Sequence, residues 1–313
     1  MNLYVYTLRR LLYIIPVLLG VCAIVFFLFS VVSPDPTLIM LGKHASVQQM
    51  EELRRELGLD RPWFIQYLDI VKSAFTFDFG RSWSTKQEIS TMIKQGAIPS
   101  LTLSLPAFVI SFVISITVSL MVAFYRGKFL DKIAVFGCVS MMSISSLAYI
   151  LFGQWFFGYK LGWFEISGYD YGFPDFIPYV LLPILIWVIL GLGPEVRFYR
   201  TVLLDEIYQD YVRTARAKGL GEHVILFKHV LKNALIPIIT NLIISIPFLI
   251  LGALLLESFF SIPGLGAMTL NAVNASDFPV IKAMTILTSV AYIIFSVITD
   301  ICYTLVDPRV RLR

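Results

Sequence analysis

Charged residues are scarce in this sequence. Asp, Glu, Lys and Arg make up 15% of its 313 residues, whereas hydrophobic residues make up 58%. An average soluble domain has about 25% charged residues. This shortage of charge excludes an ordinary soluble enzyme, a disordered chain and a nucleic-acid-binding protein. It indicates that a lipid bilayer surrounds most of the chain.

Cysteine and histidine are also rare. The three cysteines, Cys22, Cys138 and Cys302, lie in apolar stretches, where a thiol behaves as a small hydrophobic group and provides no disulfide framework. The three histidines are scattered, without a cysteine or carboxylate at the spacing of zinc ligands. We therefore expect no metal site in this chain.

Motifs for nucleotide binding and hydrolysis are lacking as well. A P-loop reads Gly, four residues, Gly, Lys and then Ser or Thr. The Gly-Lys pairs at 42–43 and 127–128 are followed by His44 and Phe129, and both lack the upstream glycine. There is no G-x-S-x-G, no H-E-x-x-H and no pair of carboxylates on one apolar segment. The chain is expected to bind no cofactor and to be non-catalytic.

The sequence does contain six long apolar segments. A helix needs about 20 apolar residues to cross a hydrocarbon core about 30 Å thick, because every backbone polar group must be paired inside the segment. The first run is too long for a cleaved signal peptide and is expected to stay as an anchor. We predict an all-α polytopic membrane protein whose six transmembrane helices cover residues 11–32, 101–124, 133–159, 177–193, 234–256 and 283–306.

Basic residues are distributed unequally between the short loops. One side has only Lys160 and Lys282, and the other side has fifteen. Short loops rich in Lys and Arg stay in the cytoplasm, while long loops such as 33–98 do not report orientation. Both termini are therefore predicted to be cytoplasmic. The fifteen residues are Arg9, Arg10, Arg126, Lys128, Lys132, Arg197, Arg200, Arg213, Arg216, Lys218, Lys228, Lys232, Arg309, Arg311 and Arg313.

The predicted organisation has four parts: the N-terminus with the first span (1–32), an extracytoplasmic loop domain (33–98), a five-helix transmembrane core (99–306) that includes a cytoplasmic loop (194–233), and a cytoplasmic tail (307–313). In the loop domain, a Ser46 and Gln49 capping box, Gly58 and Pro62 predict two short helices. This domain either caps the outer ends of the bundle or offers a docking surface to an extracytoplasmic partner.

The cytoplasmic loop contains a short basic helical pattern. Asp210 is a good N-cap, Gly219 is a good left-handed C-cap, and the last turn between them carries Arg216 and Lys218. After Gly221 a second helical pattern runs toward the fifth span, with Val224, Phe227, Val230 and Leu231 on its apolar face.

Two interpretations of the first short helix remain open. Its small residues Ala215, Ala217 and Gly219 would let the backbone of another protein approach closely. Alternatively, the helix lies on lipid headgroups while its basic side chains extend toward water.

Four motifs resemble one family of transport proteins. YVRTARAKGL at 211–220, followed by KHVLKNALIP at 228–237, resembles the cytoplasmic EAA loop of binding-protein-dependent ABC importers in its peptide and nickel branch. LGLDRPWFIQYL at 57–68 with FDFGRSW at 77–83, ESFFSIPGLG at 257–266 and VDPRVR at 306–311 resemble other segments of that branch. Relative to the wider EAA consensus, Ala215, Gly219 and Leu231 agree, whereas Arg213 and Thr214 replace the first two residues.

The resemblance implies the type I ABC importer permease fold and the first permease subunit of an oligopeptide or dipeptide importer in the bacterial inner membrane. It implies a second homologous permease subunit, two ATPase subunits that bind ATP and Mg, an extracytoplasmic substrate-binding protein, a peptide substrate and membrane lipid, and no nucleic acid. A permease for nickel, glutathione-like compounds or another small solute is the alternative. A proton-coupled secondary transporter is less favoured, since such proteins usually show repeated halves and several buried charges.

The resemblance also assigns candidate residues. The coupling helix, which would dock into an ATPase subunit, comprises Tyr211, Val212, Arg213, Thr214, Ala215, Arg216, Ala217, Lys218, Gly219 and Leu220. An outer loop that dips toward the mouth of the pathway would contain Glu257, Pro263, Gly264 and Gly266. Turn formation alone is a sufficient explanation for these glycines.

Serines recur in two of the predicted spans. Ser104, Ser111, Ser115 and Ser119 share one helix face, and Ser140, Ser143 and Ser146 recur every third residue. Such small polar faces serve close helix packing, or they line a pathway for peptide. Asp300 is the one acid well inside a predicted span. An acid there either has a structural partner or relays protons, and its place near the cytoplasmic end favours the structural partner.

Overall fold

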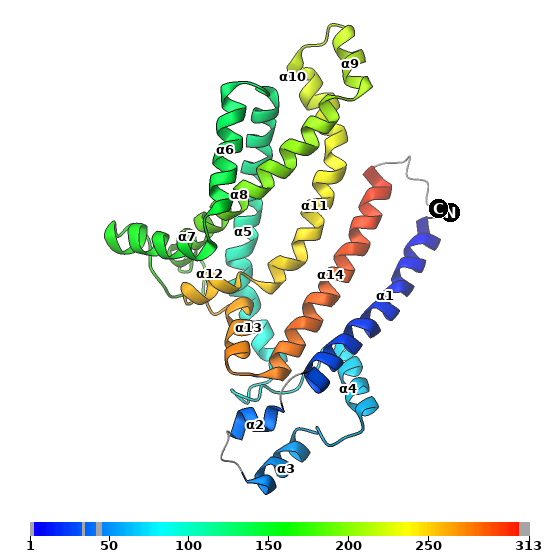
Figure 1. Cartoon of the computed structure of the whole chain (residues 1–313), viewed down its shortest axis with the longest axis vertical. Helices are drawn as coiled ribbons and strands as arrows, with labels where there is room; N and C mark the ends of the chain where they lie inside the picture. Colours follow the sequence, from blue (N-terminus) through cyan, green and yellow to red (C-terminus); the bar gives the residue numbers. More distant parts are fainter. Residues whose placement is uncertain (1–2, 33–34, 42–45, 307–313) are drawn as a thin grey trace.

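The computed structural model describes residues 3–32, 35–41 and 46–306. Regular structure in these ranges is helical, apart from one isolated β-bridge between Arg81 and Glu88. Figure 1 shows long helices side by side, with one group of short helices at each end of the bundle. The all-α prediction is confirmed. The predicted tail at 307–313 and the side chain of Asp300 lie outside what the structure describes.

Five helical segments are long and apolar enough to cross a membrane, and one bent pair would supply a sixth. This agrees with the predicted six spans. The central contacts run between α5 and α8, and α6, α11 and α14 pack around them, while α1 packs on α14. The spanning elements are α1 (Leu3–Phe27) with the π-helical turn η1 (Leu28–Val32), α5 (Ile89–Phe124), α6 (Phe129–Ser143), α8 (Ile177–Ile207), α11 (Leu231–Leu251) and α14 (Phe278–Val306).

The third predicted span, 133–159, is not one straight helix. The chain leaves helical geometry at Ile144 and Ser145, and α7 (Ser146–Gly153) with the π-helical turn η2 (Gln154–Lys160) continues at 88° to α6. The Tyr149 hydroxyl donates to the Met141 carbonyl at 3.1 Å and so satisfies one of the carbonyls that the end of α6 leaves free. Apolarity alone could not reveal this bend, because both arms are apolar.

The limits of the fourth and fifth spans also differ from the prediction. The fourth was expected to end at Gly193, but α8 continues through Pro194 to Ile207 and carries part of the expected cytoplasmic loop. The fifth was expected to reach Leu256, but α11 ends at Gly252, whose φ of 71° is left-handed. The short helices α12 (Leu254–Phe259) and α13 (Leu265–Asn274) then lead to α14.

The outer loop domain forms three short helices, α2 (Pro36–Leu41), α3 (Val47–Glu56) and α4 (Trp63–Thr76). The expected capping box is present, since the Gln49 amide N–H donates to Ser46 Oγ and the Ser46 N–H donates to Gln49 Oε1. α5 begins at Ile89, so the predicted boundary at 98 falls inside a helix. The first turns of α5 are polar, but they are fixed to the rest of the chain because Ile89 is buried in a cluster with Leu265 and Val280.

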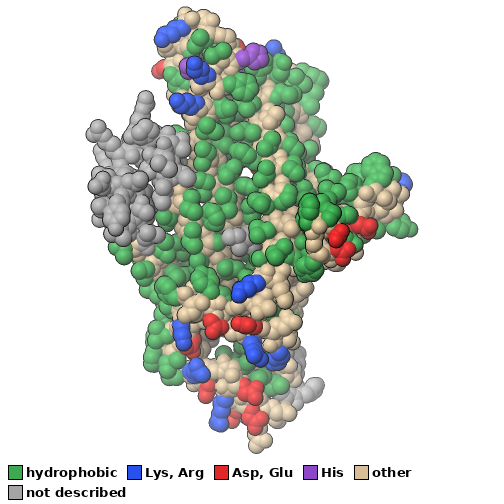
Figure 2. Space-filling model, turned by 180° about the vertical axis from the view of Figure 1, so that it is seen from behind, with side chains coloured by type: hydrophobic (Ala, Val, Ile, Leu, Met, Phe, Trp, Pro, Cys, Tyr) green, Lys and Arg blue, Asp and Glu red, His purple; other side chains and the backbone are tan. Residues whose placement is uncertain are grey.

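Charged side chains lie mainly at the two ends of the molecule, with a broad apolar surface between them (Figure 2). At the end formed by α9 (Asp210–Ala217) and α10 (Glu222–Val224), lysine, arginine and histidine predominate. Here Arg200 of α8 binds Asp131 of α6 through two bonds of 2.7 and 3.0 Å, and the Gly127 N–H donates to the same carboxylate. This pair fixes α6 and α8 to each other at the basic end.

Candidate functional site

The short basic helix of the sequence prediction is α9. The structure places Gln209, not Asp210, at its N-cap, and Asp210 is the first helical residue. The Asp210 carboxylate instead lies 3.2 Å from the Arg213 guanidinium. At the other end of α9 the C-cap is Lys218, and Gly219 follows it with the predicted left-handed backbone, at a φ of 76°. The N–H groups of Gly219 and Leu220 donate to Arg216 O and Ala215 O, the pair of bonds that defines a Schellman motif.

One face of α9 packs inside the chain. Val212 and Ala215 are buried in a cluster with Leu203 of α8 and Val230 of the π-helical turn η3 (Ile225–Val230). The predicted patch of small residues is therefore wrong in part, because Ala215 points into this cluster while Ala217 and Gly219 are exposed. The second predicted apolar face is shifted too: Ile225, Leu226 and Val230 are buried, and Val224 and Phe227 are exposed.

Polar bonds hold α9 at both ends. The Tyr211 hydroxyl donates to Glu206 of α8 at 2.6 Å, and Arg216 binds Glu222 of α10 through two bonds. Burial and the contact with Glu206 raise the pKa of Tyr211 to about 12, so the hydroxyl keeps its proton at neutral pH. The remaining outward side chains, among them Arg213, Thr214 and Lys218, form a basic surface attached firmly to α8.

The serine face of α5 is buried, and it contacts an acid that the sequence analysis did not single out. Ser111 and Ser115 donate to the same Glu195 oxygen of α8, at 2.9 and 2.7 Å. The first and last serines of the series, Ser104 and Ser119, donate to the carbonyls of Leu249 and Val196. All four are at most 1% exposed. These bonds serve helix packing within the chain.

Glu195 was missed because Gly193 and Pro194 looked like the end of a span, which placed the acid in a loop. The second serine series does not share one helix face, because the bend after α6 separates Ser143 from Ser146. Ser143 donates to the Val139 carbonyl of its own helix, and Ser140 and Ser146 are half-buried.

A buried carboxylate organises the outer loop. Glu257 of α12 is fully buried, and its oxygens accept hydrogen bonds from Ser100 Oγ of α5 at 2.8 Å and from the N–H groups of Ala253 and Ala267 at 3.0 Å each. Ser100 Oγ also accepts the N–H of Leu265 at 2.7 Å. One carboxylate thus joins the end of α11, the start of α13 and α5.

Glycines leave room for this carboxylate. A side chain at Gly252 or Gly264 would overlap the Glu257 oxygens, and Gly252 also has a left-handed backbone. The structure therefore brings together Glu257, Gly264 and Gly266 of the predicted outer loop, whereas Pro263 is exposed beside them. We name this arrangement of Glu257, Ser100 and the surrounding loop backbone the outer node.

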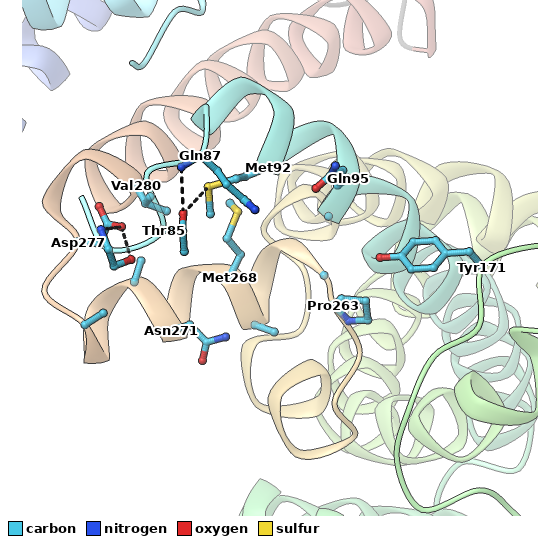
Figure 3. Close-up of a pocket in the computed structure, with 16 residues that line it drawn as sticks. Thr85, Gln87, Met92, Gln95, Tyr171, Pro263, Met268, Asn271, Asp277 and Val280 are labelled. Carbon is cyan, nitrogen blue, oxygen red and sulfur yellow. Dashed lines mark hydrogen bonds between the residues drawn. The ribbon is translucent and has the colours of Figure 1, made fainter. Parts of the chain in front are cut away.

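A cavity of about 330 Å³ opens next to the outer node. Figure 3 shows the side-chain amides of Gln87, Gln95 and Asn271 around it, with Met92 and Met268 between them. Its lining carries amide donors and acceptors and flexible thioethers, and its one acid, Asp277, is fully engaged elsewhere. Such a lining suits an uncharged polar ligand of small size.

Asp277 ties the first outer loop to the turn before α14. Its carboxylate accepts hydrogen bonds from the Ser82 hydroxyl, the Ser84 hydroxyl and the backbone N–H groups of Trp83 and Ser84. Burial alone would raise the pKa of Asp277, but these four bonds outweigh it and hold the pKa below the usual 3.8. No sequence motif indicated this contact between segments almost two hundred positions apart.

This tether should open only in strong acid. A folded-state pKa below the unfolded value means that the contribution of Asp277 to stability is complete above the ordinary Asp pKa and is lost as pH falls through the lowered value. We expect pepsin cleavage between Phe79 and Thr85 to stay slow down to about pH 4 and to accelerate below it. Asp277→Asn should be cleaved faster throughout, whereas the exposed control Asp60→Asn should follow the wild type. Identical profiles for Asp277→Asn and wild type would contradict the tether.

Comparison with known families gives two matches in chain order. Residues 115–312 match the model described as "Binding-protein-dependent transport system inner membrane component", and residues 3–88 match the model of the N-terminal part of such a membrane component. The first of these matches includes Glu195, α9 and Glu257, and the second includes the outer loop domain as far as residue 88.

Curated relatives match along almost their whole length. The chain is 34% identical over 316 residues to a putative peptide permease protein of Brucella suis, covering 98% of both chains. It is 30% identical over 308 residues to the glutathione transport system permease protein GsiC of Shigella flexneri and to that of Escherichia coli K12, covering 98% of this chain and 99% of each relative.

Proposed function

Because the chain belongs to the family of binding-protein-dependent transport system inner membrane components, we propose that it is the permease subunit of an ATP-driven importer of peptides. It would form half of the pathway, and a second homologous permease subunit would form the other half. The names of its relatives support a peptide-type cargo, and glutathione is one such compound. The amide-lined cavity beside the outer node is compatible with a peptide backbone.

The observation that carries this proposal is the attachment of α9. The α9 helix, which carries the basic surface, follows α8, and α8 runs without a break from the bundle interior. Val212 and Ala215 are buried and fix α9 to the end of α8. We propose that α9 is the coupling helix and docks on an ATPase subunit, with Arg213, Thr214, Ala217, Lys218 and Gly219 in contact. A rigid connection is what a coupling element needs in order to switch a bundle between two packings.

The other partners follow from this role. Two ATPase subunits would bind ATP and Mg, an extracytoplasmic binding protein would deliver the peptide, and this chain would be non-catalytic. Both termini would lie in the cytoplasm of a bacterial cell. The gathering of basic side chains at the α9 end supports that orientation (Figure 2).

Reconstitution tests the proposal directly. Proteoliposomes that contain the full complex should accumulate a labelled dipeptide only with ATP and with the binding protein present. Replacing the Walker lysine in the ATPase subunits should abolish uptake. ATP-independent uptake by this chain alone would contradict the proposal.

The orientation has its own measurement. Single cysteines at Lys218 and Lys160 should be labelled by a membrane-impermeant maleimide from the cytoplasmic and the extracytoplasmic side, respectively, in a variant without Cys22, Cys138 and Cys302. Labelling of both positions from one side would contradict the predicted topology.

A further inference from the structure

A second cavity, of about 320 Å³, lies where the outer ends of α1 and α14 meet α4. It shares no lining residue with the cavity of Figure 3. Ile70 and Ile286 form part of its apolar wall and belong to a cluster with the buried Cys22. The lower ends of α1 and α14 lie beside α4 in Figure 1, with no other span outside them. This cavity is therefore at the periphery of the bundle.

A partly buried lysine lines this cavity. Lys282 is in the second turn of α14, is only partly exposed, and has its ammonium 5.7 Å from the centre of the Phe29 ring. Within the described ranges, no carboxylate lies within salt-bridge distance of Lys282. A partly buried ammonium is costly unless an anion or several hydrogen-bond acceptors compensate it.

The other polar groups of the cavity also favour an anion. Arg81 adds a second positive charge, and the hydroxyls of Ser30 and Ser73 are hydrogen-bond donors. The one acid in the lining, Asp69, lies 3.3 Å from the Arg61 guanidinium, so its charge is already compensated. The cavity therefore carries a net positive charge with hydroxyl donors, the chemistry that binds an oxyanion.

We propose that this cavity binds the headgroup phosphate of an outer-leaflet phospholipid. Ile24, Phe27 and Leu28 precede the lining residue Ser30 along α1 and η1, and their exposed side chains would provide an apolar surface for acyl chains. Lys282 and Phe29 mark the level at which two spans end, which is where headgroups lie. Basic pockets between transmembrane helices are suited to anionic headgroups. Alternatively, the Lys282 ammonium could extend toward water at this level, and in that case the cavity would bind no phosphate.

Binding assays on the full-length transporter in detergent test this site. Phosphatidylglycerol, diacylglycerol with the same acyl chains, and inorganic phosphate would each be titrated and followed by native mass spectrometry and by thermal unfolding. We expect phosphatidylglycerol to bind and stabilise the wild type more than diacylglycerol. Lys282→Met should weaken this binding by about tenfold, because a charge-assisted hydrogen bond is lost, and Lys282→Arg should retain it.

Lys160→Met is the matched control. Lys160 is the other basic residue of the short outer loops and also lies over aromatic rings, those of Trp155 and Phe156, so its loss should leave the affinity unchanged. If Lys282→Met does not fold, Arg81→Gln serves in its place and should also weaken binding. Equal affinities for phosphatidylglycerol and diacylglycerol, or for wild type and the Lys282 variant, would overturn the site. If inorganic phosphate binds in a way that depends on Lys282 and phosphatidylglycerol binds no better, the site binds free phosphate, and the proposal of a phospholipid headgroup is wrong.

Discussion

Replacing Glu257 with alanine should release the outer loop from α5. The change removes the acceptor of the buried Ser100 hydroxyl, the buried Ala267 N–H and the partly buried Ala253 N–H, and each fully buried group left unpaired costs about 1–3 kcal/mol. The free energy of unfolding should therefore fall by roughly 3–5 kcal/mol, a large share of the total stability of a typical protein. Thermal unfolding of the purified chain in detergent measures the loss, and peptide uptake should fall with it.

Two further variants isolate the cause. Glu257→Gln keeps the shape but turns an amide NH2 toward backbone donors, so it should recover only part of the stability. Glu165→Ala removes an exposed acid of another outer loop and should change nothing. Wild-type stability in Glu257→Ala would show that the bonds of the outer node contribute little.

Replacing Gly219 with valine should uncouple the cytoplasmic helix from transport. A β-branched residue at a φ of 76° costs about 1–2 kcal/mol, and a Cβ would meet no other atom, so the effect acts through the backbone alone. A cost of this size lowers the equilibrium constant for forming the α9 cap about tenfold. We expect peptide-stimulated ATP hydrolysis and uptake by the full complex to fall about tenfold while the chain still inserts and folds.

The neighbouring glycine supplies the control. Gly221 has a φ of −68° and the same open surroundings, and it is the N-cap of α10. Gly221→Thr is also β-branched and is as good an N-cap as glycine, so it should be nearly neutral. Gly219→Asn should rescue activity, because asparagine tolerates the left-handed region. If Gly219→Val were fully active, the left-handed end of α9 would have no role in coupling.

The sequence predicted the elements whose signals are local. Apolar length identified the membrane-crossing segments, Ser46 with Gln49 identified the start of α3, and Gly219 identified the end of α9. Each of these signals lies within a few residues of the feature that it specifies. The α9 helix was therefore located closely, although Gln209 and not Asp210 occupies its N-cap.

The features that were missed depend on contacts between distant segments. Inside α8, the Glu195 carboxylate accepts hydrogen bonds from two serines of α5, and without these donors Gly193 and Pro194 would be a reasonable helix end. The role of Glu257 at the outer node and that of Asp277 in the tether also need partners more than a hundred residues away. A residue pattern can indicate that such an acid is important, but its hydrogen-bond donors can be identified only in the folded chain.

The paired attachments of α5 restrict where this helix can flex. Its inner half is bound to α8 at Ser111 and Ser115, and its outer half is bound to the loop at Ser100. Only about 16 Å of helix separate these anchors, and Pro106 lies between them. A proline lacks the amide hydrogen that would stiffen this stretch. If α8 moves relative to the outer node, we expect α5 to bend most easily close to Pro106.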